Sequence, residues 1–148
     1  MNEMIKIIQK TLPPNTSLSE RFIEAVLKRL VSFGYNLNGG ADGCVLAFAI
    51  QKVESHIKNS CNVTDIPDGL FFNAVDRVCG EFLYSKKQTG QLELEGLDLS
   101  AAIASISEGD TSISFNTGTS DEERFNLLLS WLINSGEGDF VCYRKLKW

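Results

Sequence analysis

Apolar side chains recur every three or four residues along most of the chain, which is the spacing of one face of an α-helix. From Ser17 to Phe33 this stripe alternates with charged positions such as Glu20 and Arg29. Its members are Phe22, Ile23, Val26, Leu27, Leu30 and Val31. Gly34 follows the last of them, and glycine is the residue most typical of a helix end. The pattern therefore predicts an amphipathic helix over residues 17–33.

The same periodicity predicts three further helices. A short one over residues 1–12 ends at Pro13-Pro14, because proline cannot continue a helix. The turn-rich stretch 36–43 is predicted as a loop, and a helix follows over about 42–59. Another helix begins near Pro67 and continues to about Lys87, and Gly80 within it indicates close approach of a neighbouring helix. The predicted core positions of these two helices are Leu46, Ala49, Ile50, Val53, Ile57, Phe71, Val75, Val78 and Phe82, and the last four are flanked by Phe72, Cys79 and Leu83.

The last helix has the clearest start in the chain. Ser120 followed by Glu123 forms the capping-box pattern, and the acidic residues of the first turn favour the helix dipole. Apolar positions continue to Leu132, and Gly136 marks the end. Between this helix and the one before it, residues 88–96 are predicted as a loop. Residues 97–102 are compatible with either a short helix or an extended lead into the next segment.

A β-hairpin is predicted over residues 104–115, where serine alternates with isoleucine or phenylalanine. The turn falls at Glu108-Gly109-Asp110, since glycine tolerates the positive φ angle of tight hairpin turns. An isolated hairpin is marginal in water, so we expect it to be mobile in the free protein and to gain partners in an assembly. The interface residues predicted here are Ser107, Glu108, Gly109, Asp110 and Thr111.

The chain ends in a basic and aromatic segment, which we predict to be a C-terminal contact tail over residues 137–148. The interface residues predicted in it are Tyr143, Arg144, Lys145, Lys147 and Trp148. Aromatic residues and arginine are enriched at protein interfaces. One alternative is a patch that binds phosphate and stacks on bases. The other is a terminus that only seals the core of its own domain, which is common in small domains.

Taken together, the patterns predict a mainly α fold, a bundle of four to five helices with one small β-hairpin near residues 104–115. A length of 148 residues fits one domain. We therefore expect a single domain over 1–148, with residues 1–16 as a possible N-terminal extension.

Net charge and hydropathy argue against some classes of function. The net charge of −5 and sequence pI near 4.9 argue against a broad DNA-binding surface, because such binding depends on Lys and Arg displacing counterions. The same net charge and pI do not argue against a protein that DNA passes without binding. The sequence offers neither an apolar run long enough for a bilayer nor a signal-peptide pattern. We therefore expect the protein to be made in the cytoplasm.

The sequence suggests no catalytic, cofactor or metal site. The four cysteines, at positions 44, 61, 79 and 142, lack the spacing of a zinc site or a disulfide framework. His56 lies beside the predicted core face of its helix, with no nucleophile and orienting carboxylate to complete a triad. The glycine-rich stretch 38–43 lacks the Lys-Ser/Thr ending of a P-loop. We expect buried structural thiols and a protein that is not an enzyme.

Four segments, in this order, resemble the head–tail connector (adaptor, or head-completion) proteins of long-tailed bacteriophages. They are residues 57–63 (IKNSCNV) with 65–70 (DIPDGL), residues 75–83 (VDRVCGEFL), the hairpin 106–113 (ISEGDTSI) and the ending 143–148 (YRKLKW). The resemblance covers most of the chain from about Phe22 onward. Residues 1–12 have no counterpart in it.

The resemblance implies a structural subunit at the virion head–tail junction. Such subunits form a homo-oligomeric ring of about a dozen copies beneath the portal protein, extend the DNA channel and dock the tail or a stopper protein. DNA passes through without sequence-specific binding, and an acidic wall that repels phosphate suits that passage. The alternatives are a small cytoplasmic helical interaction module and, third, an enzyme whose site the sequence does not reveal.

Overall fold

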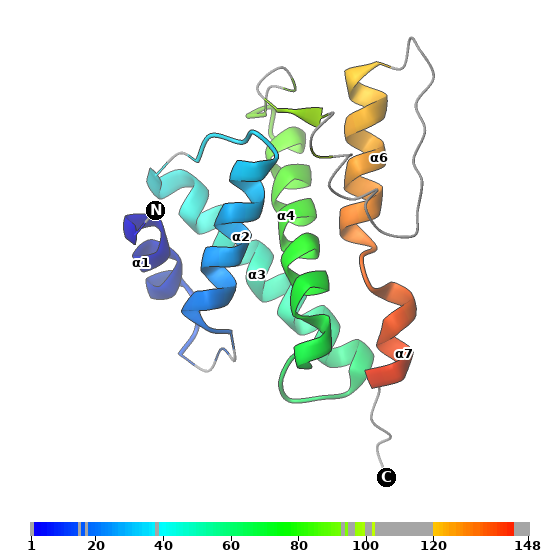
Figure 1. Cartoon of the computed structure of the whole chain (residues 1–148). Coiled ribbons are helices and arrows are strands. Elements are labelled where there is room, and N and C mark those ends of the chain that lie inside the picture. The colour runs from blue at the N-terminus through cyan, green and yellow to red at the C-terminus, as the bar shows by residue number, and fades with distance from the viewer. Residues whose placement is uncertain are drawn as a thin grey trace.

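The computed structural model describes residues 2–14, 16, 18–37, 39–92, 94, 97–99, 102 and 120–143 (Figure 1). Its helices are α1 (Asn2–Thr11), α2 (Glu20–Ser32), α3 (Gly39–Cys61), α4 (Phe71–Gln88), α6 (Asp121–Ile133) and α7 (Phe140–Tyr143). Two 3-10 turns, η1 (Asp68–Leu70) and η3 (Glu137–Asp139), precede α4 and α7. The predicted mainly α bundle is confirmed, with five helices of ten or more residues among the described residues.

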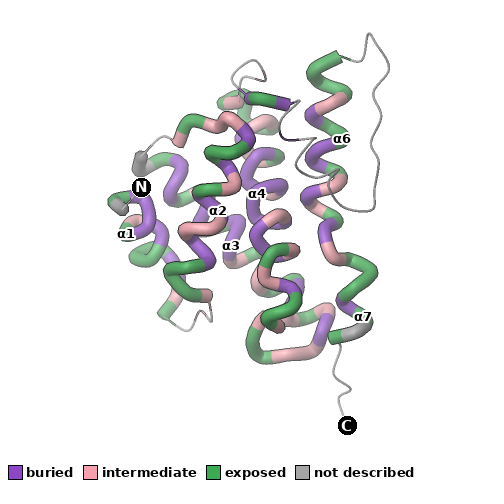
Figure 2. Tube along the Cα trace, in the orientation of Figure 1, coloured by how far each residue is buried: buried purple, intermediate pink, exposed green. Residues whose placement is uncertain are grey.

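Helix α4 is the centre of the bundle. It packs against α2, α3 and α6, while α1 covers α3 and the edge of α2 (Figure 1). The buried faces of α2, α3, α4 and α6 turn towards one another (Figure 2). The largest wholly buried side chains are Phe22, Phe33, Phe82 and Phe125. Each such side chain contributes about 1.5–3 kcal/mol by leaving water, so this aromatic core is the main force holding the helices together.

The close approach inferred from Gly80 is confirmed. A Cβ placed on Gly80 would lie only 2.8 Å from the Cβ of Leu132 in α6. The start of α6 is confirmed as well, since the Ser120 hydroxyl accepts a hydrogen bond from the Glu123 backbone N–H at 3.2 Å. Gly136 has a φ of 76°, a left-handed conformation that glycine adopts without steric cost. The chain leaves α6 there and enters η3.

The predicted loop over residues 36–43 is too long, because α3 already begins at Gly39. The cause is tertiary packing of α1 on this first turn. A Cβ on Gly43 would lie 2.6 Å from Cγ2 of Ile7, so the glycine that resembles a loop residue is needed for helix contact. Asp42 in the same turn is wholly buried.

Two positions predicted to lie beside the core are exposed. Val31 is 49% exposed and Phe72 is 71% exposed, although both fit the helical periodicity. Each lies at the border of its apolar stripe, where one step of 100° turns a side chain from the core towards solvent. The other predicted core positions of α2 and α3 are buried, namely Phe22, Ile23, Val26, Leu27, Leu30, Leu46, Ala49, Ile50, Val53 and Ile57.

The segment that follows α4 closes one end of the bundle. Leu97, Leu99 and Ala102 are buried, and the Ala102 N–H donates to the carbonyl of Asp98 at 2.9 Å, which favours the helical alternative at Leu99 and Ala102. The β-hairpin is not seen, since residues 104–115 lie outside the described residues, which themselves contain no strand. Within that same described part, no helix has the length and apolar character needed to cross a membrane.

Candidate functional site

Of the ten interface residues predicted from the sequence, only Tyr143 is among the described residues. The hairpin positions 107–111 and the tail positions 144, 145, 147 and 148 lie outside them. Tyr143 is the last residue of α7 and is 36% exposed. Its hydroxyl lies so close to Gly69 that any side chain at that position would overlap it. Tyr143 therefore packs on its own domain at the start of η1 while keeping part of its ring in solvent.

A polar cleft of about 410 Å³ lies between α3, α4 and the end of α6. His56 and Lys52 come from α3, Arg77 and Glu81 from α4, and Glu137 from η3. The remaining lining residues are Val53, Ile133 and Asn134. The cleft therefore brings together charged groups from three separated parts of the sequence.

Arg77 is the centre of this cleft. Its side chain is only 7% exposed, and its Nε donates to the carbonyl oxygen of Ser135 at 2.7 Å. Its Nη2 donates to the carboxylate of Glu137, and its guanidinium lies 4.6 Å from the centre of the Phe140 ring. Removing a buried cation from water is costly unless several partners replace the lost hydration. Arg77 therefore fixes residues 135–140 to the body of the bundle.

The Arg77 hydrogen bond holds the pKa of Glu137 below its usual value, with a further lowering from the positive charge of Arg77. His56 Nε2 lies 4.0 Å from the same carboxylate, and the His56 ring lies 5.9 Å from that of Phe140. The sequence-based interpretation of His56 as a residue at the edge of the core agrees with this position. The cluster is a connection between the C-terminal segment and α3.

Nothing in the described part of the cleft makes a nucleophile–base pair. The thiol of Cys61 is wholly buried, and its Sγ lies 3.7 Å from the carbonyl oxygen of Phe140. Cys61 and Cys79 are buried free thiols as predicted, whereas Cys44 is exposed. Among the described residues, no group of three or more His, Cys, Asp or Glu side chains is placed to bind a metal ion.

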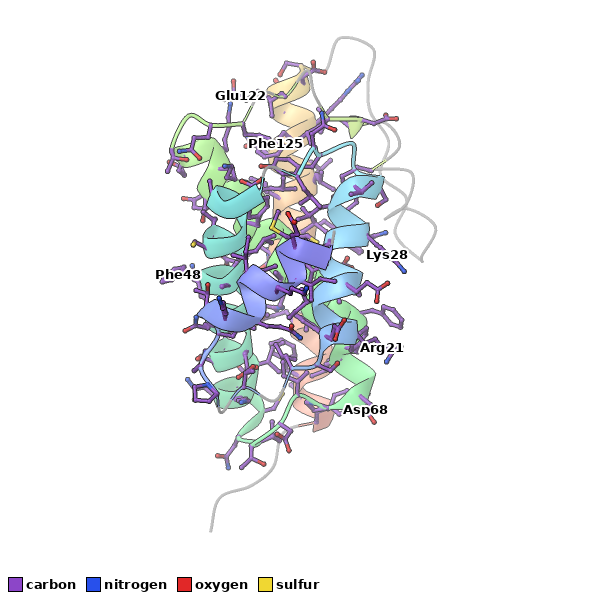
Figure 3. All side chains as sticks on the ribbon, turned by 90° about the vertical axis from the view of Figure 1, so that its left-hand side faces the viewer. Arg21, Lys28, Phe48, Asp68, Glu122 and Phe125 are labelled. Carbon is purple, nitrogen blue, oxygen red and sulfur yellow. The ribbon has the colours of Figure 1, made fainter. Side chains whose placement is uncertain are left out.

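Two exposed phenylalanines mark the sides of the bundle. Phe48 on α3 is 70% exposed and Phe72 on α4 is 71% exposed. Phe72 borders a groove of about 490 Å³ between α2 and α4, whose other wall includes Ala25 and Lys28. Figure 3 shows Phe48 and Lys28 pointing to opposite sides of the molecule. The bundle thus presents an exposed aromatic side chain on each of two different faces.

A second polar cluster, at the other end of the bundle, was not predicted from the sequence. The Asp42 carboxylate is wholly buried and lies 2.8 Å from Nζ of Lys86, whose side chain is 7% exposed. The Tyr35 hydroxyl donates to the same carboxylate at 2.9 Å. Burial and this carboxylate raise the pKa of Tyr35. The only sequence hint was an aspartate placed between glycines before an apolar helix face.

Comparisons with known proteins give no further guide. No protein-family model matches the chain, no curated protein is significantly similar to it in sequence, and no solved structure matches its fold significantly.

Proposed function

We propose that this protein is a structural subunit of a bacteriophage head–tail connector, which assembles as a ring beneath the portal, extends the DNA channel and docks the tail. The proposal starts from the four segments whose order resembles that family. The observation that carries it structurally is the pair of exposed phenylalanines, Phe48 on α3 and Phe72 on α4 beside the groove between α2 and α4.

A ring subunit must offer two different faces, because each copy contacts one neighbour through one face and the next through another. On association, an exposed phenylalanine buries a large apolar surface at little conformational cost. The groove between α2 and α4 beside Phe72 and the projecting Phe48 on α3 supply two such unlike faces. The acidic net charge of −5 favours a channel that does not retain DNA.

The experiment mixes the purified chain with the portal protein encoded in the same genome. We expect a stable complex with about a dozen copies of this chain per portal ring, measured by size-exclusion chromatography with light scattering. Phe48→Asp should prevent ring formation, since it would place a charge in the contact. Leu127→Asp, on α6 and 40% exposed, is the matched control and should leave the complex intact. Failure of the unmodified chain to bind the portal contradicts the proposal.

The tail provides a separate test. A chain lacking residues 144–148 should keep its melting temperature while losing affinity for the portal or for a neighbouring subunit. A large fall in melting temperature instead would mean that the tail belongs to the core of its own domain.

A helical protein-interaction module outside a virion is the second candidate, because the same exposed phenylalanines would serve any protein partner. Gene position separates the two. A gene located beside portal, protease and capsid genes favours the connector, and a gene in an unrelated bacterial operon favours the module.

A further inference from the structure

A small groove lies where α7 meets the loop before α4. It has a volume of about 360 Å³ and is lined by residues 63–68 and Tyr143. Since Tyr143 packs against Gly69, this residue forms a fixed wall of the groove. The chain continues from that wall into residues 144–148, so the first residue of the tail is one peptide bond away from the groove.

Two carboxylates give the groove negative charge. Asp65 and Asp68 are both exposed on its lining, and neither forms an ion pair with another described residue. Both aspartates also line a neighbouring hollow that contains Arg21, whose guanidinium lies over the ring of Phe71, 4.5 Å from the ring centre. Figure 3 shows Arg21 and Asp68 at the same end of the molecule. The groove therefore favours a cationic ligand.

Apart from Thr64 and Tyr143, the rest of the lining is apolar. Val63, Ile66 and Pro67 are partly buried, and Val63 and Ile66 pack against the core. A ligand that matches this groove must combine positive charge with an apolar or aromatic group. Covering an exposed apolar surface of this kind is favourable by a free energy of about 25 cal/mol per Å² of area removed from water.

The chain's own ending has this composition. Residues 144–148 are Arg-Lys-Leu-Lys-Trp, three cations with two large apolar side chains. Five extended residues reach about 17 Å, which is enough to cross a groove that begins at Tyr143. A segment attached this closely has an effective concentration on the order of millimolar, so a contact within one chain forms before a weak contact between chains.

We propose that the groove formed by residues 63–68 and Tyr143 is the docking site of the C-terminal tail of the same chain, residues 144–148. The basic side chains pair with Asp65 and Asp68, and the tail's apolar side chains cover Val63, Ile66 and Pro67. In the free subunit the tail is thereby kept from other acidic partners until one competes for it. The inference does not depend on the connector assignment, because the contact lies within one chain.

The test uses Trp148 as its probe, in a full-length Trp131→Phe background, since the chain has two tryptophans. Accessibility of Trp148 to acrylamide, a neutral quencher, is measured by fluorescence. In the parent protein we expect Trp148 to be shielded from acrylamide. In Asp65→Lys/Asp68→Lys we expect this shielding to be lost and the emission maximum of Trp148 to shift to the red. Adding Lys145→Glu/Lys147→Glu to that variant should restore the shielding. Glu3→Lys/Glu122→Lys is the control, because it makes the same change in net charge at exposed positions elsewhere.

Three results would overturn the proposal. The first is equal quenching in the parent and in Asp65→Lys/Asp68→Lys. The second is an equal loss of shielding in the control variant, which would show an effect of net charge alone. The third is shielding that grows with protein concentration, which would assign the groove to the tail of a second copy. A thermal unfolding curve for each variant confirms that the compared proteins are folded.

Discussion

At the scale of single residues, glycines and one arginine determine how closely the helices pack. Gly80 lets α6 approach α4, and Gly43 lets α1 approach α3. Arg77 connects the segment after α6 to α4 through Ser135 and Glu137. All three residues act through the absence or presence of a few atoms at one contact, so each can be tested by one substitution.

Gly80→Ala should destabilise the fold by about 1–3 kcal/mol, the usual cost of adding a methyl group to a close-packed interior. The new Cβ would lie 2.8 Å from the Leu132 Cβ and 3.1 Å from the backbone nitrogen of Ile133. Urea unfolding followed by circular dichroism measures the change. Gly138→Ala is the matched control, because a Cβ there meets no atom within 4 Å. Equal stability of the two variants would mean that α4 and α6 are less close than described.

The Arg77–Glu137 contact gives a pH dependence with a defined sign. The pKa of Glu137 is lower in the folded protein than its usual value, so the contribution of its carboxylate is present above the unfolded pKa. It is lost as pH falls through the lowered, folded pKa. The parent should therefore exceed Glu137→Gln in stability at pH 7, and the difference should disappear in strongly acidic solution. Unfolding curves at both pH values measure it, and a difference that persists in acid would contradict the assignment.

Residue-scale contacts of this kind were only partly predictable. Gly80 was identified because a glycine inside a long helical pattern needs a packing reason. Arg77 was not, because Val75-Asp76-Arg77-Val78 reads as an ordinary amphipathic sequence. Its partners come from 58 and 60 residues later in the chain, and no local pattern carries that pairing.

At the scale of elements, hydrophobic periodicity predicted the helices well and their ends less well. The start of α6 was correct because Ser120 caps it through a local contact that the sequence displays. The start of α3 was wrong because it depends on contacts with distant parts of the chain, α1 at Gly43 and Lys86 of α4 at Asp42. The existence of a helix can be predicted from the local sequence pattern. A helix end that is fixed by a tertiary contact cannot be predicted from that pattern.

Asp42→Asn tests the contact with Lys86. The substitution leaves the Lys86 ammonium buried without its counter-charge, which costs on the order of 3–5 kcal/mol. We expect a matching loss in the free energy of unfolding, with faster hydrogen exchange in the first turns of α3. Glu54→Gln, which weakens the partly exposed pair with Lys58, should cost much less. A small effect of Asp42→Asn would mean that the α3 start is held by the packing of α1 alone.

At the scale of the whole molecule, the described residues form one bundle in which α4 touches α2, α3 and α6. Its exposed apolar side chains are single and dispersed over several helices: Val31, Phe48, Phe72, Tyr84, Leu127, Val141 and Tyr143. A stable dimer normally forms through one large apolar patch. Dispersed side chains of this kind are more typical of a subunit that associates only on a template.

The free protein should therefore be a monomer or a small oligomer at micromolar concentration. Multi-angle light scattering measures the mass directly against the 16.4 kDa of one chain. A tight dimer that persists on dilution would argue against a subunit that needs the portal as a template, and would direct attention to an obligate pair interface.

The contact of Cys61 with Phe140 means that the rate of Cys61 modification reports how often the C-terminal segment opens. The thiol is wholly inaccessible and lies under the segment that Arg77 holds, so a thiol reagent can reach it only when that segment lifts. In a Cys44→Ser/Cys142→Ser background, Cys61 should be modified slowly in the parent and faster in Arg77→Met, with Cys79 in the bundle core remaining protected in both. Mass spectrometry of the modification then gives the opening rate of the C-terminal segment without any attached label. An equal rate in parent and variant would show that Arg77 does not control that opening.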